Sequence, residues 1–177
     1  MPTSLEDTQR WLEKVVIGLN LCPFAAAPQR SGRVRLTSAE NTAWEALLPT
    51  IVEEVLRLDD WPPQEVATTL LLLPEAGSFT DLLALAAAAS DVLEEMGLTD
   101  DYQLVVFHPD FRYEGADPDD PANLTNRSPC PLIHILREED VDRAVADHPD
   151  INAIPEDNAA RLRALGSAAV HARWMMT

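Results

Sequence analysis

The chain has 177 residues, of which 46% are hydrophobic and 24% charged, a length and composition typical of one domain with a sizeable core. Its formal net charge of −17 excludes a general nucleic-acid or anionic-membrane surface, because such surfaces need clustered Lys and Arg. No apolar stretch reaches the roughly 18 residues of a membrane span, and the N-terminal MPTSLEDTQR lacks the apolar segment of a signal peptide. We therefore expect a single cytoplasmic domain over residues 1–177, with neither membrane nor nucleic acid as a partner.

The first half of the chain predicts two helices and two strands. Apolar residues recur at helical spacing over 5–19, and this helix should stop near 18–23. Residues 33–37 alternate charged and apolar side chains, as a short half-exposed strand does. An apolar stripe predicts a helix over 43–58, and the compact apolar run 67–74 predicts a strand buried on both faces.

The second half predicts a capped helix, two more strands and two further helices. Ser78 and Asp81 form a capping-box pattern that begins a helix ending at Gly97. Strands are expected over 102–109 and 131–137, separated by a loop of about twenty residues, and loops of that length tend to be functional or disordered. Helices should follow over 138 to about 148 and 156–165, with a fraying tail over 166–177.

This order of elements predicts the fold class. Alternating helices and strands favour one α/β domain with a small mixed sheet covered by helices and a long loop between the last two strands. The order of strands in the sheet and the oligomeric state do not follow from the sequence.

Chemically capable side chains are concentrated in FHPDFRYEGADPDDPANLTNRSPCPLIH, residues 107–134. His108 ends a strand and precedes Asp110, where a histidine can act as a base, a metal ligand or a hydrogen-bond donor, or be held structurally in the core. His134 alternates with Leu132 and Leu136, so it should be half buried, and its nitrogens need partners.

Cys22 lies in GLNLCPF, where the first helix should end. A thiol in a turn constrained by the following proline can face a cavity, although a buried structural cysteine is the common alternative. A helix C-terminus disfavours thiolate, so activation would need a nearby cation or metal.

Asn126 and Arg127 lie in the turn-forming stretch ANLTNRSP, and Arg137 leaves the last strand. The planar guanidinium suits a carboxylate or phosphate, but Arg127 can equally pair with Asp119 or Asp120 and fix the loop. The signatures of P-loop, dinucleotide, zincin and serine-hydrolase sites are absent from the sequence.

Five motifs, in chain order VIGLNLCPFA, FHPDF, DPANLTNRSP, LIHILRE and NAARLRALG, resemble the bacterial domain-of-unknown-function family 1415 over roughly residues 10–166. The resemblance implies that the candidate residues occupy motif positions, and it implies no activity. Two departures stand out: Cys130 lies where the family usually has an aromatic residue, which argues against a shared catalytic role, and the helix over 79–90 lacks the family's polar and aromatic run. The second departure would alter specificity if that helix lines the site.

Three functions are consistent with these residues. The first is an enzyme acting on a small anionic metabolite, with Cys22 as nucleophile or redox thiol, His108 and His134 as acid/base groups, and an anion clamp of Arg127 and Arg137 beside Asn126 and Asp110. The second is a transition-metal or haem protein with ligands from Cys22, His108 and His134. The third is a non-enzymatic module that binds a small ligand or an acidic partner.

Overall fold

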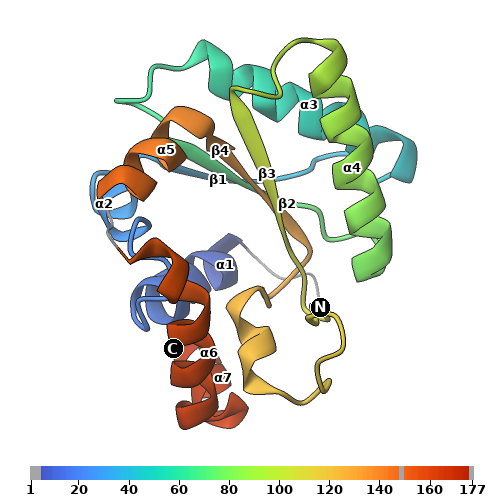
Figure 1. The fold of residues 1–177 in the computed structure, drawn as a ribbon. Coiled ribbons are helices and arrows are strands. Elements are labelled where there is room, and N and C mark those ends of the chain that lie inside the picture. Colours follow the sequence, from blue (N-terminus) through green and yellow to red (C-terminus); the bar gives the residue numbers. More distant parts are fainter. Residues whose placement is uncertain (1–4, 148–149, 176–177) are drawn as a thin grey trace.

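A mixed four-stranded sheet forms the centre of the protein in a computed structural model, which describes residues 5–147 and 150–175 (Figure 1). The strands are β1 (Val34–Ser38), β2 (Thr68–Leu72), β3 (Tyr102–Phe107) and β4 (Leu132–Arg137). Their order is β1-β2-β4-β3, with β1 and β2 parallel and β4 antiparallel to both of its neighbours. The last strand in the sequence therefore lies between β2 and β3.

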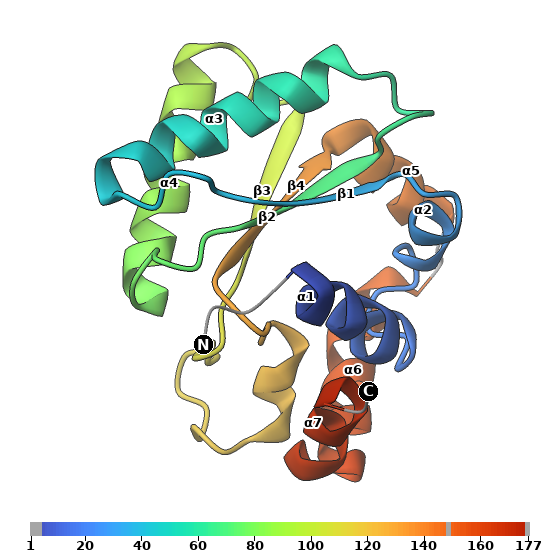
Figure 2. The same cartoon turned by 180° about the vertical axis from the view of Figure 1, so that it is seen from behind.

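One face of the sheet is covered by α3 (Trp44–Asp60) and α4 (Phe79–Glu95) (Figures 1 and 2). Most of the stripe predicted for α3 is buried: Leu47, Ile51, Val55 and Leu58 are fully buried and Leu48 partly so. Trp44, which the prediction placed on the same stripe, is instead 48% exposed at the first residue of the helix. The predicted capping box is also present, because the Ser78 side chain accepts from the backbone N–H of Asp81 while the Asp81 carboxylate accepts from that of Ser78.

The opposite face carries a second core built from both ends of the chain. It combines α1 (Leu5–Trp11), the π-helix η1 (Leu12–Ile17), the 3-10 helix η2 (Pro121–Thr125), α6 (Ile154–Leu165) and α7 (Ser167–Met175). The short α2 (Ala26–Arg30) lies beside β1 and α5 (Glu138–Asp147) continues from β4, while η3 (Ile151–Ala153) leads into α6 (Figure 1). The α/β class and the sheet covered by helices are thus confirmed.

The elements differ from the sequence expectation mainly at the two ends. The first helix changes to π geometry from Leu12, and the predicted fraying tail contains helix α7, whose Val170 is fully buried. His148 and residues 176–177 lie outside the described residues. Within the part of the chain that is described, no helix has the length and apolarity required to cross a membrane.

Candidate functional site

Cys22 occupies a tight turn between η1 and α2 rather than the end of a helix. Sγ accepts hydrogen bonds from the backbone N–H groups of Phe24 and Ala25, which lower the pKa of the thiol, while burial raises it more strongly. The net effect is a raised pKa, so the thiol is protonated at neutral pH. The sequence expectation of an unfavourable helix C-terminus is wrong, because the chain leaves η1 at Ile17 and the backbone amides after Cys22 turn toward the sulfur.

Helix α6 holds the backbone that leads into this turn. The buried side chain of Asn158 donates to the carbonyl oxygen of Leu21 at 2.7 Å, and Arg161 donates to those of Leu19 and Asn20 at 2.8 and 3.1 Å. Asn20 has a left-handed φ of 51°, the only positive φ of a non-glycine residue within 5–147 and 150–175. The backbone of Asn20 is strained, and side chains of α6 hold the carbonyl groups around it. Together these features indicate that the conformation of this turn is specifically maintained.

His134 lies in the middle of β4 on the sheet face that carries the second core, opposite Leu70 of β2. Thr68 donates its hydroxyl proton to the carbonyl oxygen of Ile135 at 2.6 Å, so at 2.7 Å from Nε2 its oxygen can only accept. This arrangement fixes the tautomer with the proton on Nε2 and the lone pair on Nδ1. Nδ1 has no hydrogen-bond partner among the residues that the structure describes.

The surroundings of His134 keep its ring neutral. Burial lowers the pKa of the imidazole to about 4, because a charged ring would lose its hydration among apolar side chains. At neutral pH, Nδ1 is therefore an acceptor: it can take a proton, accept a hydrogen bond or bind a metal.

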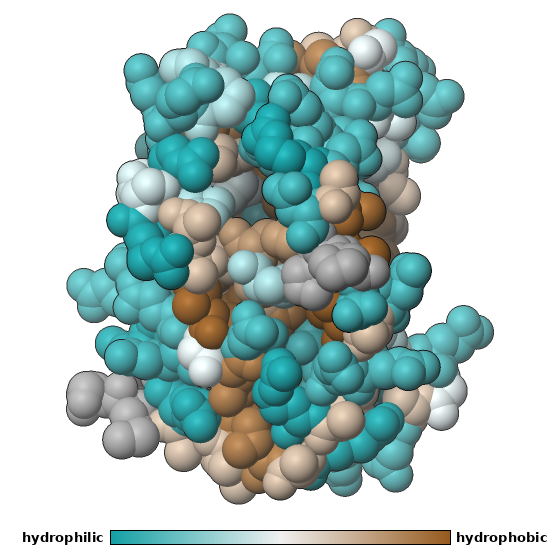
Figure 3. All heavy atoms as spheres, turned by 60° about the vertical axis from the view of Figure 1, so that its left-hand side comes forward, coloured by the Kyte–Doolittle hydropathy of each residue, from teal (hydrophilic) through white to brown (hydrophobic). Residues whose placement is uncertain are grey.

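Cys22 and His134 lie on the same side of the sheet. Cys22 packs against the second core, as does Phe107, whose ring centroid is 6.4 Å from that of His134. Four other apolar residues are also only partly buried and packed against the second core: Ile17, Ala25, Val34 and Leu36. Figure 3, which looks at the side of α2 and α5, shows apolar atoms exposed in a hollow between hydrophilic surroundings.

His108 is oriented away from this group. Its Nδ1 accepts from the backbone N–H of Asp110 at 3.0 Å, so Nε2 carries the proton and donates to the carbonyl oxygen of Gly77 at 3.1 Å. The ring is buried against Phe79 at the start of α4. Both ring nitrogens are satisfied by the backbone, and His108 joins the long loop to the helix on the other face of the sheet.

Arg127 and Asn126 shape the long loop. Arg127 donates from Nε to the carbonyl oxygen of Phe111 at 2.8 Å and from one terminal nitrogen to that of Pro118 at 2.9 Å. The Asn126 carbonyl accepts from the backbone N–H of His108 at 3.2 Å. The expected alternative partner of Arg127 is engaged elsewhere, since Asp120 pairs with Arg163, which lowers the pKa of the Asp120 carboxyl to about 2.

Arg137 holds the end of α3. One terminal nitrogen donates to the carbonyl oxygens of Leu58 and Trp61, both at 2.6 Å, and the other donates to the Tyr102 hydroxyl at 3.3 Å. This guanidinium stabilises the carboxyl end of a helix, where the last carbonyls lack partners within the helix. The two arginines of the predicted clamp are thus in separate places, and each is bonded to backbone oxygens.

The candidate metal ligands are not brought together. His108 bonds toward α4, whereas His134 and Cys22 lie on the opposite side of the sheet. Over the described ranges 5–147 and 150–175, no three His, Cys, Asp or Glu side chains form a group that could hold a metal ion. The second cysteine, Cys130, is buried, and burial raises the pKa of its thiol to about 11.

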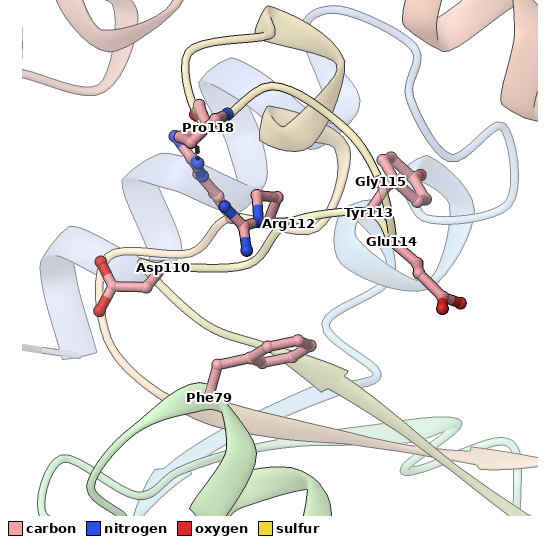
Figure 4. Close-up of a pocket in the computed structure, with 8 residues that line it drawn as sticks. Phe79, Asp110, Arg112, Tyr113, Glu114, Gly115 and Pro118 are labelled. Carbon is pink, nitrogen blue, oxygen red and sulfur yellow. Dashed lines mark hydrogen bonds between the residues drawn. The ribbon is translucent and has the colours of Figure 1, made fainter.

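A separate pocket of about 470 Å³ lies in the long loop (Figure 4). Asp110, Glu114 and Arg127 line it, together with residues that the sequence did not single out: Phe79, Arg112, Tyr113, Gly115 and Pro118. The sequence also missed Thr68, Asn158 and Arg161. A threonine facing a histidine is recognisable only once the register of β2 and β4 is known, and backbone carbonyls as partners leave no signal in the sequence.

The family model described as protein of unknown function (DUF1415) matches residues 3–172. No curated protein and no solved structure matches the chain.

Proposed function

The chain belongs to the DUF1415 family, and from the geometry of its own residues we propose that it is a thiol-dependent enzyme acting on a small molecule with an electrophilic carbon. Cys22 is the nucleophile and Nδ1 of His134 is the proton acceptor. The observation that carries the proposal is the tautomer of His134, which leaves an unpaired lone pair on the same side of the sheet as the thiol. The substrate would contact the partly buried apolar side chains that pack beside Cys22 on this side of the sheet.

Cys22, His134 and Thr68 would act as nucleophile, base and orienting group, the three roles by which enzymes activate a nucleophile. Thr68 plays the orienting part, because its hydroxyl is fixed on a backbone carbonyl and holds the Nε2–H of His134. Asn158 and Arg161 fix the turn that presents Cys22.

The pKa values determine how such a reaction would proceed. The thiol has a pKa above 9.0 and the imidazole one of about 4. A resting thiolate–imidazolium pair is therefore disfavoured, because burial opposes the charged form of both groups. Proton transfer must accompany attack: the Sγ–carbon bond forms, the thiol proton passes to Nδ1, and for an acyl substrate the carbonyl electron pair moves onto its oxygen. The imidazolium then returns the proton to the leaving group, which departs and leaves a thioester.

This proposal narrows the first function predicted from the sequence. It keeps the thiol and one histidine, whereas His108 and the two clamp arginines are bonded to backbone atoms. Because the side chains packed beside Cys22 are apolar, a substrate would be held chiefly by its apolar part.

Acylation of Cys22 by p-nitrophenyl acetate tests the proposal without knowledge of the substrate. The rate of acyl-enzyme formation is followed by intact-protein mass spectrometry between pH 6 and 8, with Cys22→Ala as the control for the site of attack. If His134 is the base, the rate stays nearly level over this range, because the imidazole is neutral throughout. Attack by free thiolate would instead rise about tenfold per pH unit below the thiol pKa.

His134→Gln separates the two cases. Glutamine retains an N–H donor for Thr68 and lacks a base, so the rate at pH 7 should fall at least tenfold and acquire the steep pH dependence. Equal rates and equal pH profiles in the native protein and in His134→Gln would refute the role of His134, and persistent acylation in Cys22→Ala would refute that of Cys22.

A further inference from the structure

We propose that the pocket in the long loop is a second binding site, separate from the Cys22–His134 side, and that it takes a small organic monoanion with a flat apolar body, such as an aromatic carboxylate. The pocket lies where the loop after β3 meets the start of α4, and α4 covers the opposite face of the sheet from the one that Cys22 packs against.

The loop is held in shape by side chains that are themselves fully engaged. Asn123 is completely buried; its amide nitrogen donates to the carbonyl oxygen of Asp117 at 2.9 Å, and its oxygen accepts from the backbone N–H of Tyr113 at 3.1 Å. Arg127 adds its bonds to Phe111 and Pro118. The pocket wall is therefore preorganised, which reduces the entropy lost when a ligand binds.

Arg112 supplies the charge that a ligand would meet. Its guanidinium is exposed at the pocket and forms no hydrogen bond or ion pair within the described part of the chain. In Figure 4 the carboxylates of Asp110 and Glu114 lie on opposite sides of the pocket, both pointing away from Arg112. An unpaired arginine in so acidic a loop is consistent with a site for an anionic group from outside the chain.

The same two carboxylates set the charge of the ligand. They flank the pocket, so a dianion such as phosphate would be repelled more strongly than a single carboxylate.

Aromatic rings form an apolar wall for the body of the ligand. Phe79 and Tyr113 line the pocket. Phe111, which does not line it, supports both rings from behind: it contacts Phe79 edge to face with ring centroids 5.3 Å apart and Tyr113 in the same way at 4.9 Å. Such rings favour contact with a flat apolar group. A volume of about 470 Å³ suits a small molecule rather than a macromolecule.

Phenylacetate is a suitable probe, with phenylacetamide as its uncharged analogue and inorganic phosphate as the compact dianion. Binding is measured by titration of the backbone amide signals of residues 111–115 in nitrogen–proton NMR spectra. We expect saturable shifts with phenylacetate and at least tenfold weaker binding of phenylacetamide and of phosphate.

Two variants locate the site. Arg112→Gln should weaken phenylacetate binding at least tenfold, whereas Arg30→Gln, which removes an exposed arginine from α2, should leave it unchanged. Equal binding of phenylacetate and phenylacetamide, tighter binding of phosphate, or an Arg112→Gln protein that binds as the native one does would each overturn the proposal. None of these results bears on the acylation of Cys22.

Discussion

Protonation of His134 should destabilise the folded protein, and the effect can be isolated with one substitution. The pKa of the ring is about 4 in the folded state and 6.5 in the reference state, so below pH 6.5 the unfolded chain binds the proton more readily. The free energy of unfolding then falls as the pH falls from about 6.5 to 4. At pH 5 this histidine alone lowers it by about 2 kcal/mol relative to pH 7.5, since each pKa unit is worth roughly 1.36 kcal/mol.

The assay is urea unfolding of the native protein and of His134→Gln at several pH values between 5 and 7.5. Other titrating groups contribute equally to both proteins and cancel in the difference between their free energies of unfolding. This difference should change by about 2 kcal/mol across the range.

A flat difference for His134→Gln, within about 0.5 kcal/mol, would refute the reasoning. The ring would then be solvated in the folded state, and its neutral form would no longer be guaranteed at pH 6.

Two further predictions concern side chains that hold the fold. Arg137→Met should lower the free energy of unfolding by about 3 kcal/mol, because the carbonyl oxygens of Leu58 and Trp61 lose their donor. Urea unfolding measures this loss. A loss under about 1 kcal/mol would mean that water replaces the guanidinium as the donor. Glu54→Gln should lower the free energy of unfolding by about 2 kcal/mol, because the buried Glu54 carboxylate accepts hydrogen bonds from Arg35 through both of its oxygens. Thermal unfolding measures the change, and Glu53→Gln, at an exposed position of the same helix, should be almost neutral. Equal effects of the two variants would contradict this account.

The elements could be predicted from the sequence because their signals are local. The stripe of α3 and the capping box at Ser78 depend on residues within one or two helical turns, and both were confirmed except for Trp44, which is exposed. The order of the sheet could not be predicted, because β2 is fully buried and nothing in its residues specifies β4 as its neighbour. The helix α7 was missed since its short sequence becomes stable only when Val170 is buried against the second core.

The roles of the candidate residues were harder to predict than their positions. His108, Arg127 and Arg137 each bond to backbone carbonyls, some of them far away in the sequence, and a carbonyl is present at every residue. Only the structure distinguishes an arginine whose guanidinium is hydrogen-bonded to backbone carbonyl oxygens from Arg112, whose guanidinium is available at a pocket.

The position of β4 also has a consequence for synthesis of the chain on the ribosome. Strands β1, β2 and β3 emerge first, yet β2 and β3 are not neighbours: β2 can pair with β1, but its second partner and the partner of β3 are both supplied only by residues 132–137. Until then their edges are open and apolar, which favours pairing with other chains. The second core closes later still, once α6 and α7 have been synthesised and Asn158 of α6 can bond to the backbone just before Cys22.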